Sequence, residues 1–331
     1  MKVLTKLALV SGAAAVAFAA SAEARTLRLN HNNPPDHPLH ASMQYMGERL
    51  SELTDGRWDI QVFPNGQLGN QRESMELVQS CALDMAKSNA SELEAFAPAY
   101  SALNLPYLFV NEDHLFDVLT GDIGTEILDS SYDKGFQGIG FFVEGARSFY
   151  GNKPIYTPED LQGMKIRVQP SPSAIRMVEL LGGSPTPIAW GELYSALQQG
   201  VVDGAENNPT AMTTARHGEV AKHFSLDEHT MIPSAVVISN CAWDQMSDED
   251  KAAFHEAAVD AAGFHREAWD KIVEQAMVDM QEQLGVEVNE VDKAPFVEAV
   301  QPMYEEITSK SPVIADLVER IQEEGKNYGG Q

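Results

Sequence analysis

Two arginines and an asparagine near the middle of the chain are the residues best suited to bind a small organic anion. Arg167 lies in Gly163–Gln169, where apolar and polar residues alternate with the period of a half-buried strand. A guanidinium held by such a strand can donate two parallel hydrogen bonds to a carboxylate. Arg147 precedes this stretch, and Asn207 follows at the end of another predicted strand. We expect these three side chains to bind an organic anion. The alternative for a lone arginine is that it points into solvent from the exposed face of its strand.

Five further candidates for the binding site lie in loops or at the starts of predicted helices. Their side chains are three amides, an imidazole and an indole, on Asn32, Gln71, Asn89, His37 and Trp190. Neutral amides suit a hydroxylated ligand. The indole is either a core aromatic or an apolar wall that stacks on a sugar-like face. The imidazole belongs to a histidine cluster, His31, His37 and His40, for which solvated side chains are the default expectation and a ligand contact by one of them is the alternative.

The sequence carries none of the enzyme signatures that we looked for. A Gly-x-Ser-x-Gly elbow, a Walker loop, a dinucleotide fingerprint and a His-Glu-x-x-His motif are all missing. His217 and His223 are six residues apart, which would place them on different faces of a helix. We therefore predict no catalytic residue, no metal and no cofactor. A periplasmic enzyme remains an alternative class, but it would need an activated nucleophile.

The charge balance excludes two classes of partner. The 331 residues include 23 Lys and Arg against 49 Asp and Glu, a formal net charge of -26. Nucleic acid and anionic membranes require basic patches, so neither is expected as a partner. An anionic ligand is still compatible, because arginines in a dehydrated cleft outweigh distant surface carboxylates that salt screens. The length allows one large domain or two medium ones.

The N-terminus has the pattern of a secretory signal peptide, predicted over residues 1–24. Lys2 and Lys6 precede an apolar run, and Ala20-Ser21-Ala22 is a small-x-small cleavage site. No later stretch is long and apolar enough to span a membrane. We expect a secreted protein, periplasmic in a Gram-negative cell. The two cysteines, Cys81 and Cys241, could pair there, but their apolar contexts favour buried free thiols.

The predicted elements begin as strand, helix, strand, over residues 26–30, 39–53 and 57–63. This order is the unit of an open, mostly parallel sheet, in which ligands bind beyond the strand ends. One helix is predicted over 114–128, and Ser184–Pro187 reads as a rigid turn. Helical periodicity persists from Lys251 to about Leu284. That segment either breaks near Gly263 or forms one strut linking two lobes.

Several motifs stand in the order found in one family of transport proteins. They are Leu68-Gly69, Leu105-Pro106-Tyr107, Gly163–Val168, Pro185-Thr186-Pro187, Tyr194–Gly200 and Val202–Asn207. The mature chain thereby resembles solute-binding proteins of tripartite ATP-independent periplasmic (TRAP) transporters, of the dicarboxylate-binding type. The resemblance implies an α/β, two-lobe periplasmic binding protein fold, type II-like, with hinge strands and a long lobe-spanning helix. It also implies a monomer that delivers its ligand to a permease with small and large membrane subunits.

The resemblance further implies domain boundaries and residue roles. Lobe I would comprise 25–146 plus 234–272, lobe II 147–233 plus 273–300, and a helical tail 301–331. Arg167 matches the family arginine that pairs with the substrate carboxylate, Arg147 the second arginine, and Asn207 the asparagine on the same carboxylate. Asn32 matches a polar contact in the first loop of the family, and Trp190 stands at a pocket position where the family often has phenylalanine. Gln71 and Asn89 stand at positions that are acidic in sialic-acid binders.

These observations lead to one predicted function and several alternatives. We predict capture of a small carboxylate by hinge closure, with a hydroxylated sugar acid such as a hexuronate or aldonate favoured over sialic acid. A four-carbon dicarboxylate or a keto acid is the alternative ligand, and a dicarboxylate would need a second cation at the far end of the pocket. A periplasmic sensor module is the alternative role.

Overall fold

The computed structural model describes residues 24–329 of the chain. The predicted signal peptide, except for its last residue, lies outside the described residues. Within 24–329, no helix combines the length and apolar character needed to cross a membrane.

The first of two sheets has five strands in the order β2-β1-β3-β10-β4. β1, β2 and β3 run parallel, as the opening pattern predicts, whereas β10 is antiparallel to both of its neighbours. The carboxyl end of β3 therefore lies beside the amino end of β10. The bounds are β1 Arg25–Asn30, β2 Trp58–Phe63, β3 Met85–Asn89, β4 Phe136–Phe142 and β10 Ser234–Ser239.

The second sheet has six strands in the order β11-β9-β5-β8-β6-β7. Ser184–Pro187 is not the predicted rigid turn; it forms edge strand β7, which is parallel to β6. Its two prolines are tolerated because an edge strand needs backbone donors on one side only. β9 was not predicted. The bounds are β5 Arg147–Gly151, β6 Lys165–Val168, β7 Ser184–Pro187, β8 Gly204–Asn207, β9 His223–Thr230 and β11 Glu287–Glu290.

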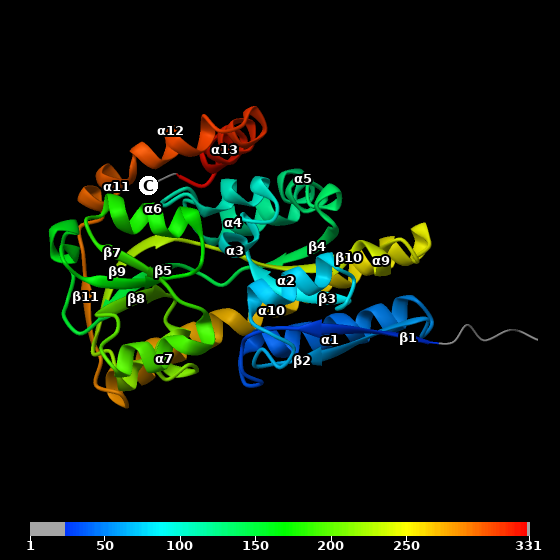
Figure 1. The fold of residues 1–331 in the computed structure, drawn as a ribbon, viewed down its shortest axis with the longest axis horizontal. Helices are drawn as coiled ribbons and strands as arrows, with labels where there is room; N and C mark the ends of the chain where they lie inside the picture. The colour runs from blue at the N-terminus through cyan, green and yellow to red at the C-terminus, as the bar shows by residue number, and fades with distance from the viewer. Residues whose placement is uncertain (1–23, 330–331) are drawn as a thin grey trace, which may run out of the picture.

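Helices cover both sheets (Figure 1). Helix α1 (Pro38–Leu53) buries Leu39, Met43, Met46 and Leu50 on one face, and His37 caps its start. The single helix predicted over 114–128 is two helices, because Gly121 ends α4 and begins α5. The others are α2 Gln71–Gln79, α3 Ala90–Leu93, α4 Glu112–Thr120, α5 Asp122–Asp129, α6 Pro172–Leu180, α7 Trp190–Gln198, α8 Thr210–Thr213, α9 Asn240–Trp243, α11 Ala294–Val300, α12 Pro302–Thr308 and α13 Pro312–Gly325.

Helix α10 (Asp248–Glu282) is one continuous helix of 35 residues, about 50 Å long. Near its start it packs on α1, where Arg49 pairs with Asp260 and Tyr45 stacks on Phe264. Farther along it packs on α8, beside the second sheet. Figure 1 shows it running beneath both halves of the molecule. The strut alternative is therefore confirmed, and Gly263 does not break the helix.

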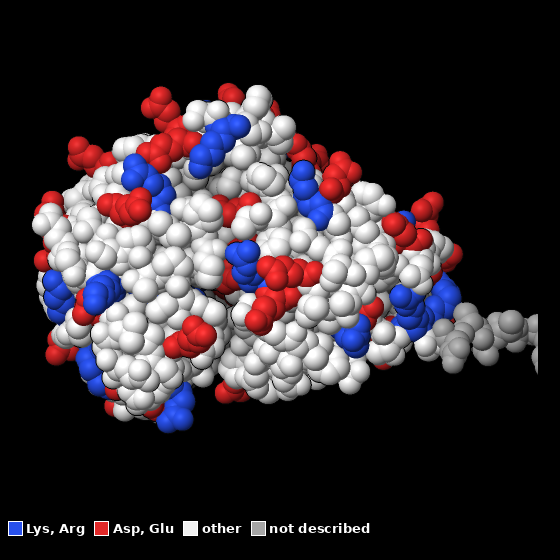
Figure 2. Space-filling model, viewed as in Figure 1, with Lys and Arg blue, Asp and Glu red and all other residues white. Residues whose placement is uncertain are grey.

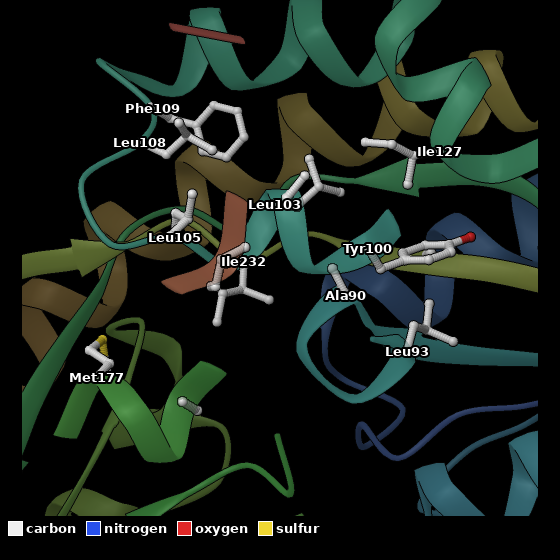
Figure 3. Close-up of a cluster of buried hydrophobic side chains, with 14 of the residues drawn as sticks. Ala90, Leu93, Tyr100, Leu103, Leu105, Leu108, Phe109, Ile127, Met177 and Ile232 are labelled. Carbon is white, nitrogen blue, oxygen red and sulfur yellow. The ribbon is translucent and has the colours of Figure 1, made fainter. Parts of the chain in front are cut away.

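The apolar cores join the two halves along one side only. One cluster lies under the first sheet and another under the second. A third contains side chains from both halves, including Leu93 and Tyr100 from the first and Met177 from the second (Figure 3). The confirmed two-lobe α/β fold thus has a shared core on one side, which leaves the opposite side available for a cleft.

The expectation of buried free thiols is wrong. Cys81 and Cys241 form a disulfide, and both residues are exposed. Cys81 follows α2 in the turn that leads to β3, and Cys241 follows β10, so two adjacent strands of the first sheet bring them together. The two cysteines are 160 residues apart in the sequence, because the segment from β5 to β9 is inserted between β3 and β10. Their proximity could therefore not be predicted from the sequence.

Candidate functional site

A polar pocket lies between the two sheets, with an empty volume of about 440 Å³. Figure 2 shows a cleft in this face of the molecule, between the part that carries α7 and the part that carries α1 and α2. Strand ends and helix starts point into the pocket, as expected for an open α/β sheet. Seven of the eight predicted site residues line it: Asn32, His37, Gln71, Asn89, Arg147, Trp190 and Asn207.

Arg147, the first residue of β5, is buried and held by β8. Its Nε donates to Oε2 of Glu206 at 2.6 Å, and one terminal nitrogen donates to the Glu206 carbonyl at 2.9 Å. The other donates to Oδ1 of Asn207 at 2.9 Å. Burial alone would lower the pKa of Arg147, but the charge of Glu206 raises it. The protein therefore already neutralises this guanidinium and fixes its direction.

Glu206 belongs to a buried chain of alternating charges. Its Oε2 also lies 3.5 Å from Nε2 of His229, whose Nδ1 lies 2.7 Å from Oδ2 of Asp227. Burial opposes protonation of this imidazole, but Asp227 and Glu206 prevail and raise its pKa to about 9. Burial would also raise the pKa of Glu206, but Arg147 and His229 hold it at about 2. These alternating charges hold the Arg147 side chain in one position.

Arg167, the predicted carboxylate ligand in β6, has a different environment. It is 1% exposed, and its Nε donates to the Ile188 carbonyl at 2.8 Å. One terminal nitrogen, Nη1, is buried without a hydrogen-bond partner, and no carboxylate lies within 4.0 Å of the guanidinium among residues 24–329. Burial lowers the pKa of Arg167. It is not among the side chains that line the pocket, but its guanidinium carbon lies over the indole ring of the lining residue Trp190, 5.8 Å from the ring centroid.

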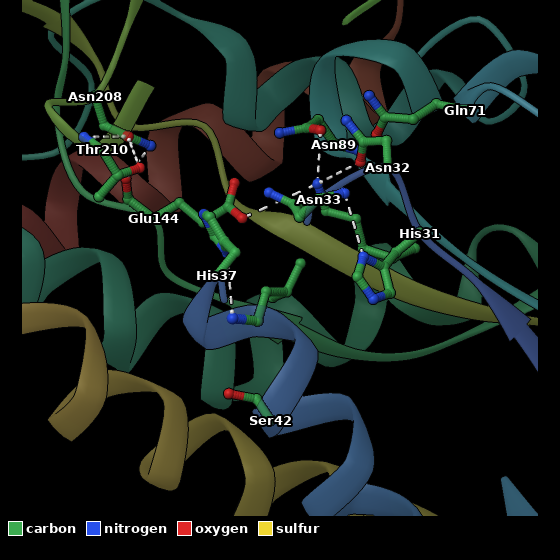
Figure 4. Close-up of polar contacts among 12 residues, drawn as sticks. His31, Asn32, Asn33, His37, Ser42, Gln71, Asn89, Glu144, Asn208 and Thr210 are labelled. Atoms are coloured by element: carbon green, nitrogen blue, oxygen red, sulfur yellow. Dashed lines mark hydrogen bonds and ion pairs between the residues drawn. The ribbon is translucent and has the colours of Figure 1, made fainter. Parts of the chain in front are cut away.

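The opposite wall is formed by Lys87 and by three amide side chains, on Asn32, Gln71 and Asn89. Figure 4 shows these three amides close together. Lys87 Nζ donates to Oδ1 of Asn89 at 3.0 Å and to Oδ1 of Asn32 at 3.4 Å, and lies 4.0 Å from Oε1 of Glu144. Gln71 accepts a hydrogen bond from the Asn89 backbone at 2.9 Å. Burial lowers the pKa of Lys87. Burial would raise the pKa of Glu144, but Lys87 and His37 lower it.

Two acceptors in this wall make no hydrogen bond within residues 24–329, although one of them, Oε1 of Glu144, lies 4.0 Å from Nζ of Lys87. Oε1 of Glu144 and Oδ1 of Asn33 are buried without a hydrogen-bond partner. Both residues line the pocket. Unsatisfied buried acceptors are costly unless something donates to them, so these two atoms mark positions for hydroxyl groups of a ligand.

Sequence analysis missed several residues of the wall. One of them had a usable signal: Lys87 lies two residues before Asn89 in β3, and side chains two apart in a strand share a face. Glu144 and Gln169 come from connecting segments, whose direction depends on tertiary packing. The missed lining residues with polar side chains are Asn33, Lys87, Glu144, Gln169, Asn208, Thr210 and Thr214.

The pocket is lined by side chains that can bind an anion and hydroxyl groups. Tyr150 and His217 are hydrogen-bonded at 2.8 Å, and burial, together with Arg167, lowers the pKa of His217 to about 3. Among residues 24–329, no three histidine, cysteine or carboxylate side chains are grouped to hold a metal ion. The arrangement can orient a carboxylate at one end and hydroxyl groups at the other.

Comparisons with known proteins agree with this geometry. Residues 29–311 match the family "Bacterial extracellular solute-binding protein, family 7". A TRAP periplasmic solute-binding protein of Xanthobacter autotrophicus, solved with β-D-galacturonate, is 39% identical with a TM-score of 0.86, covering 89% of this chain and 99% of that one. One from Anaerococcus prevotii, solved with D-glucuronate, is 36% identical with a TM-score of 0.88, covering 92% and 99%.

A curated relative represents the alternative ligand class. The C4-dicarboxylate-binding periplasmic protein of Rhodobacter capsulatus is 30% identical over 311 residues, covering 90% of this chain and 92% of that one. The family match extends over most of the chain, and both solved structures share its fold over their whole length. The chain belongs to the bacterial extracellular solute-binding proteins of family 7, the solute-binding proteins of TRAP transporters.

Proposed function

We propose that this protein binds a hexuronate, such as galacturonate or glucuronate, with the sugar carboxylate on Arg167, Arg147 and Asn207. The observation that carries the proposal is the buried guanidinium of Arg167, which has an unpaired donor and no carboxylate partner among the residues that the structure describes. A charge in that state is strongly destabilising until an anion pairs with it. Closure of the lobes on a ligand would bring its carboxylate to this group, with Trp190 adjusting between them.

The far wall suits the hydroxyl groups of a sugar ring. Glu144 and Asn33 each offer an acceptor without a donor, and Lys87 and the neighbouring amides supply donors. A site that hydrogen-bonds hydroxyl groups discriminates strongly against analogues that lack them. The relatives solved with galacturonate and glucuronate support the same ligand class.

A four-carbon dicarboxylate is the second candidate, and Lys87 is the observation that favours it. This side chain is a second buried cation opposite the arginines, as such a ligand would require. However, Glu144 and two amide oxygens already surround its ammonium group. A second ligand carboxylate would also meet the charge of Glu144. The hexuronate therefore fits the wall better.

The wider role follows from the family. We infer that residues 25–146 plus 234–272 form one lobe, that 147–233 plus 273–300 form the other, and that 301–331 form a C-terminal tail. A ligand that contacts both lobes would drive closure, because only the closed state offers both sets of contacts. The closed monomer would then deliver the ligand, in the periplasm, to the small and large membrane subunits of a permease, without catalysing a reaction. A sensor module would bind the same ligand but would not support its uptake.

The test is a binding screen of the purified mature protein, residues 25–331. Galacturonate, glucuronate, an aldonate, succinate and a keto acid are compared by thermal shift and then by calorimetry. A ligand at 100 times its Kd adds about 2.7 kcal/mol to the free energy of unfolding, which is an easily measured shift. Uronates are expected to bind most tightly. A response to succinate alone would replace the hexuronate by the dicarboxylate, and a response to no carboxylate would refute the proposed site.

A further inference from the structure

A second cavity adjoins the pocket and shares part of its wall. This outer cavity has an empty volume of about 780 Å³, and Asn32, Gln71 and Trp190 line both spaces. Its remaining wall comes from the turn after β2, the start of α2 and Glu92 of α3 on one side. The other side comes from Pro170 after β6 and from Ala189 and Gly191 at the start of α7. The outer cavity, like the pocket, therefore lies between elements of the two sheets.

The lining of the outer cavity changes from buried to exposed. Gln71 and Glu92 are 5% and 6% exposed, whereas Asn70, Arg72 and Gly191 are exposed. The buried residues lie on the side of the outer cavity that adjoins the pocket, because Gln71 lines both the outer cavity and the pocket. The outer cavity thus adjoins the pocket at its buried side and reaches solvent at its exposed side, where a group attached to the ligand could lie.

We propose that the outer cavity is a second sugar subsite, so that the protein also binds an acidic disaccharide. This inference rests on the proposed function: the pocket holds the hexuronate ring, and the outer cavity holds the sugar residue linked to it. Trp190, in the wall between the two spaces, supplies the aromatic surface on which sugar faces stack. An indole among amides and one cation is a lining suited to a polar ring with apolar faces.

The polar groups of the lining indicate that the second residue is itself an acid. Arg72 forms an ion pair with Glu76, from Nε to Oε1 at 3.1 Å, but both side chains are exposed, so the pair is weak and the other guanidinium donors remain for a ligand. Glu92 accepts from Nε2 of Gln71 at 2.7 Å, and burial raises the pKa of its carboxyl group, which favours its neutral form. Arg72 can therefore receive the carboxylate of a second uronate, and digalacturonate is the probe of choice.

Gly191 allows the outer cavity to be blocked without touching the pocket. It lies in the first turn of α7 and lines the outer cavity only. A Cβ atom built there meets no atom within 4 Å, so a larger side chain is tolerated and extends into open space. The test variant is Gly191→Phe. Gly263→Phe is the matched control, because Gly263 also lies in a helix with no atom within 4 Å of a Cβ.

The experiment measures Kd for galacturonate and digalacturonate by calorimetry in the mature protein and both variants. We expect the parent to bind both, and Gly191→Phe to weaken digalacturonate by about tenfold or more and galacturonate by less than about threefold, as steric exclusion predicts. Gly263→Phe should change neither Kd. If Gly191→Phe does not fold, Arg72→Gln replaces it, with the same selective loss of digalacturonate affinity expected.

Each contrary result has a distinct meaning. A parent that binds galacturonate but not digalacturonate overturns the second subsite and leaves the proposed function intact. The same holds if digalacturonate binds but the folded test variant weakens neither ligand, or weakens both equally. A parent that binds neither ligand overturns the proposed function together with this inference.

Discussion

Replacing Arg167 by methionine should remove ligand binding and leave the unliganded protein as stable as before, or more stable. The guanidinium is buried without a carboxylate partner, so the folded protein bears the cost of removing this charge from water. Methionine has a similar length and no charge. The substitution therefore removes a buried charge whose desolvation cost is offset only when an anion binds.

The expected magnitudes follow from the contacts of Arg167. Loss of one partner from a buried arginine–carboxylate pair costs roughly 3–5 kcal/mol, or about two to four decades in Kd. Without ligand, the variant loses one hydrogen bond, from Nε to the Ile188 carbonyl at 2.8 Å, worth about 1 kcal/mol. Removal of buried charge in favour of an apolar side chain can stabilise by about 1–4 kcal/mol. The net change in the free energy of unfolding should be about zero to 3 kcal/mol, in the stabilising direction.

Arg147→Met is the contrasting variant, because this arginine has a partner inside the protein. Its removal leaves the buried carboxylate of Glu206 with His229 alone, after losing a 2.6 Å contact. Breaking a buried pair in this way should destabilise the folded protein by roughly 3–5 kcal/mol. The two substitutions are chemically identical, yet the structure predicts opposite effects on stability.

The assay combines denaturant unfolding of the unliganded variants with calorimetric titration of a uronate. Arg216→Met serves as the control, since Arg216 is exposed and pairs only with Glu219 three residues later. It should change neither stability nor Kd appreciably. A large destabilisation of unliganded Arg167→Met would show that the guanidinium has a structural partner and would refute the reasoning. Unchanged uronate affinity in that variant would refute its role as the carboxylate ligand.

Two further predictions concern stability. The double variant Cys81→Ser/Cys241→Ser should lose roughly 2–5 kcal/mol in denaturant unfolding, because the disulfide closes a loop across 160 residues. Its uronate Kd should not change, because the bond lies at the end of β3 away from the pocket; a changed Kd would contradict this. Stability should peak near pH 6.5 in a series of thermal melts. Burial lowers the pKa of His37 to about 4, so the unfolded chain gains the proton first and stability falls from pH 6.5 towards 4. The folded pKa of His229 is about 9, so its contribution is complete below pH 6.5 and is lost as pH rises through 9. His229→Gln should lower Tm at pH 6.5 and remove the part of the alkaline decline that this histidine causes; an unchanged alkaline decline would contradict the assignment.

Elements with local signals could be predicted from the sequence. The face of α1 and the parallel opening strands follow from residue periodicity, which depends only on near neighbours. Predictions were wrong where the local structure depends on tertiary contacts. Ser184–Pro187 is a strand only because β6 pairs with it, and the disulfide forms only because β3 and β10 are adjacent. Neither adjacency leaves a trace in local sequence.

In the candidate site, too, some features could be predicted from local sequence and others depend on tertiary contacts. Arg147, Asn207 and Asn89 lie at strand ends, where topology alone directs them to the cleft. Whether a pocket cation is already paired could not be predicted, because the partners are distant in sequence. Lys87 and Glu144 are 57 residues apart, and Arg147 and Glu206 are 59 apart. That pairing nevertheless decides which cation remains for a ligand.

The balance of buried charges explains how an acidic protein can select a monoanion. Around the pocket, the cations Lys87, Arg147, Arg167 and His229 stand against the anions Glu144, Glu206 and Asp227. A fourth buried carboxyl group, that of Glu92, is left out of this balance because burial raises its pKa and so favours its neutral form. Four cations against three anions leave one positive charge, at Arg167. A single sugar carboxylate restores neutrality in a region where an unbalanced charge is costly. A dicarboxylate would instead leave one negative charge there, beside Glu144, and would have to take up a proton to be held equally well. Local pairing, rather than the net charge of the chain, therefore favours a ligand with one carboxylate.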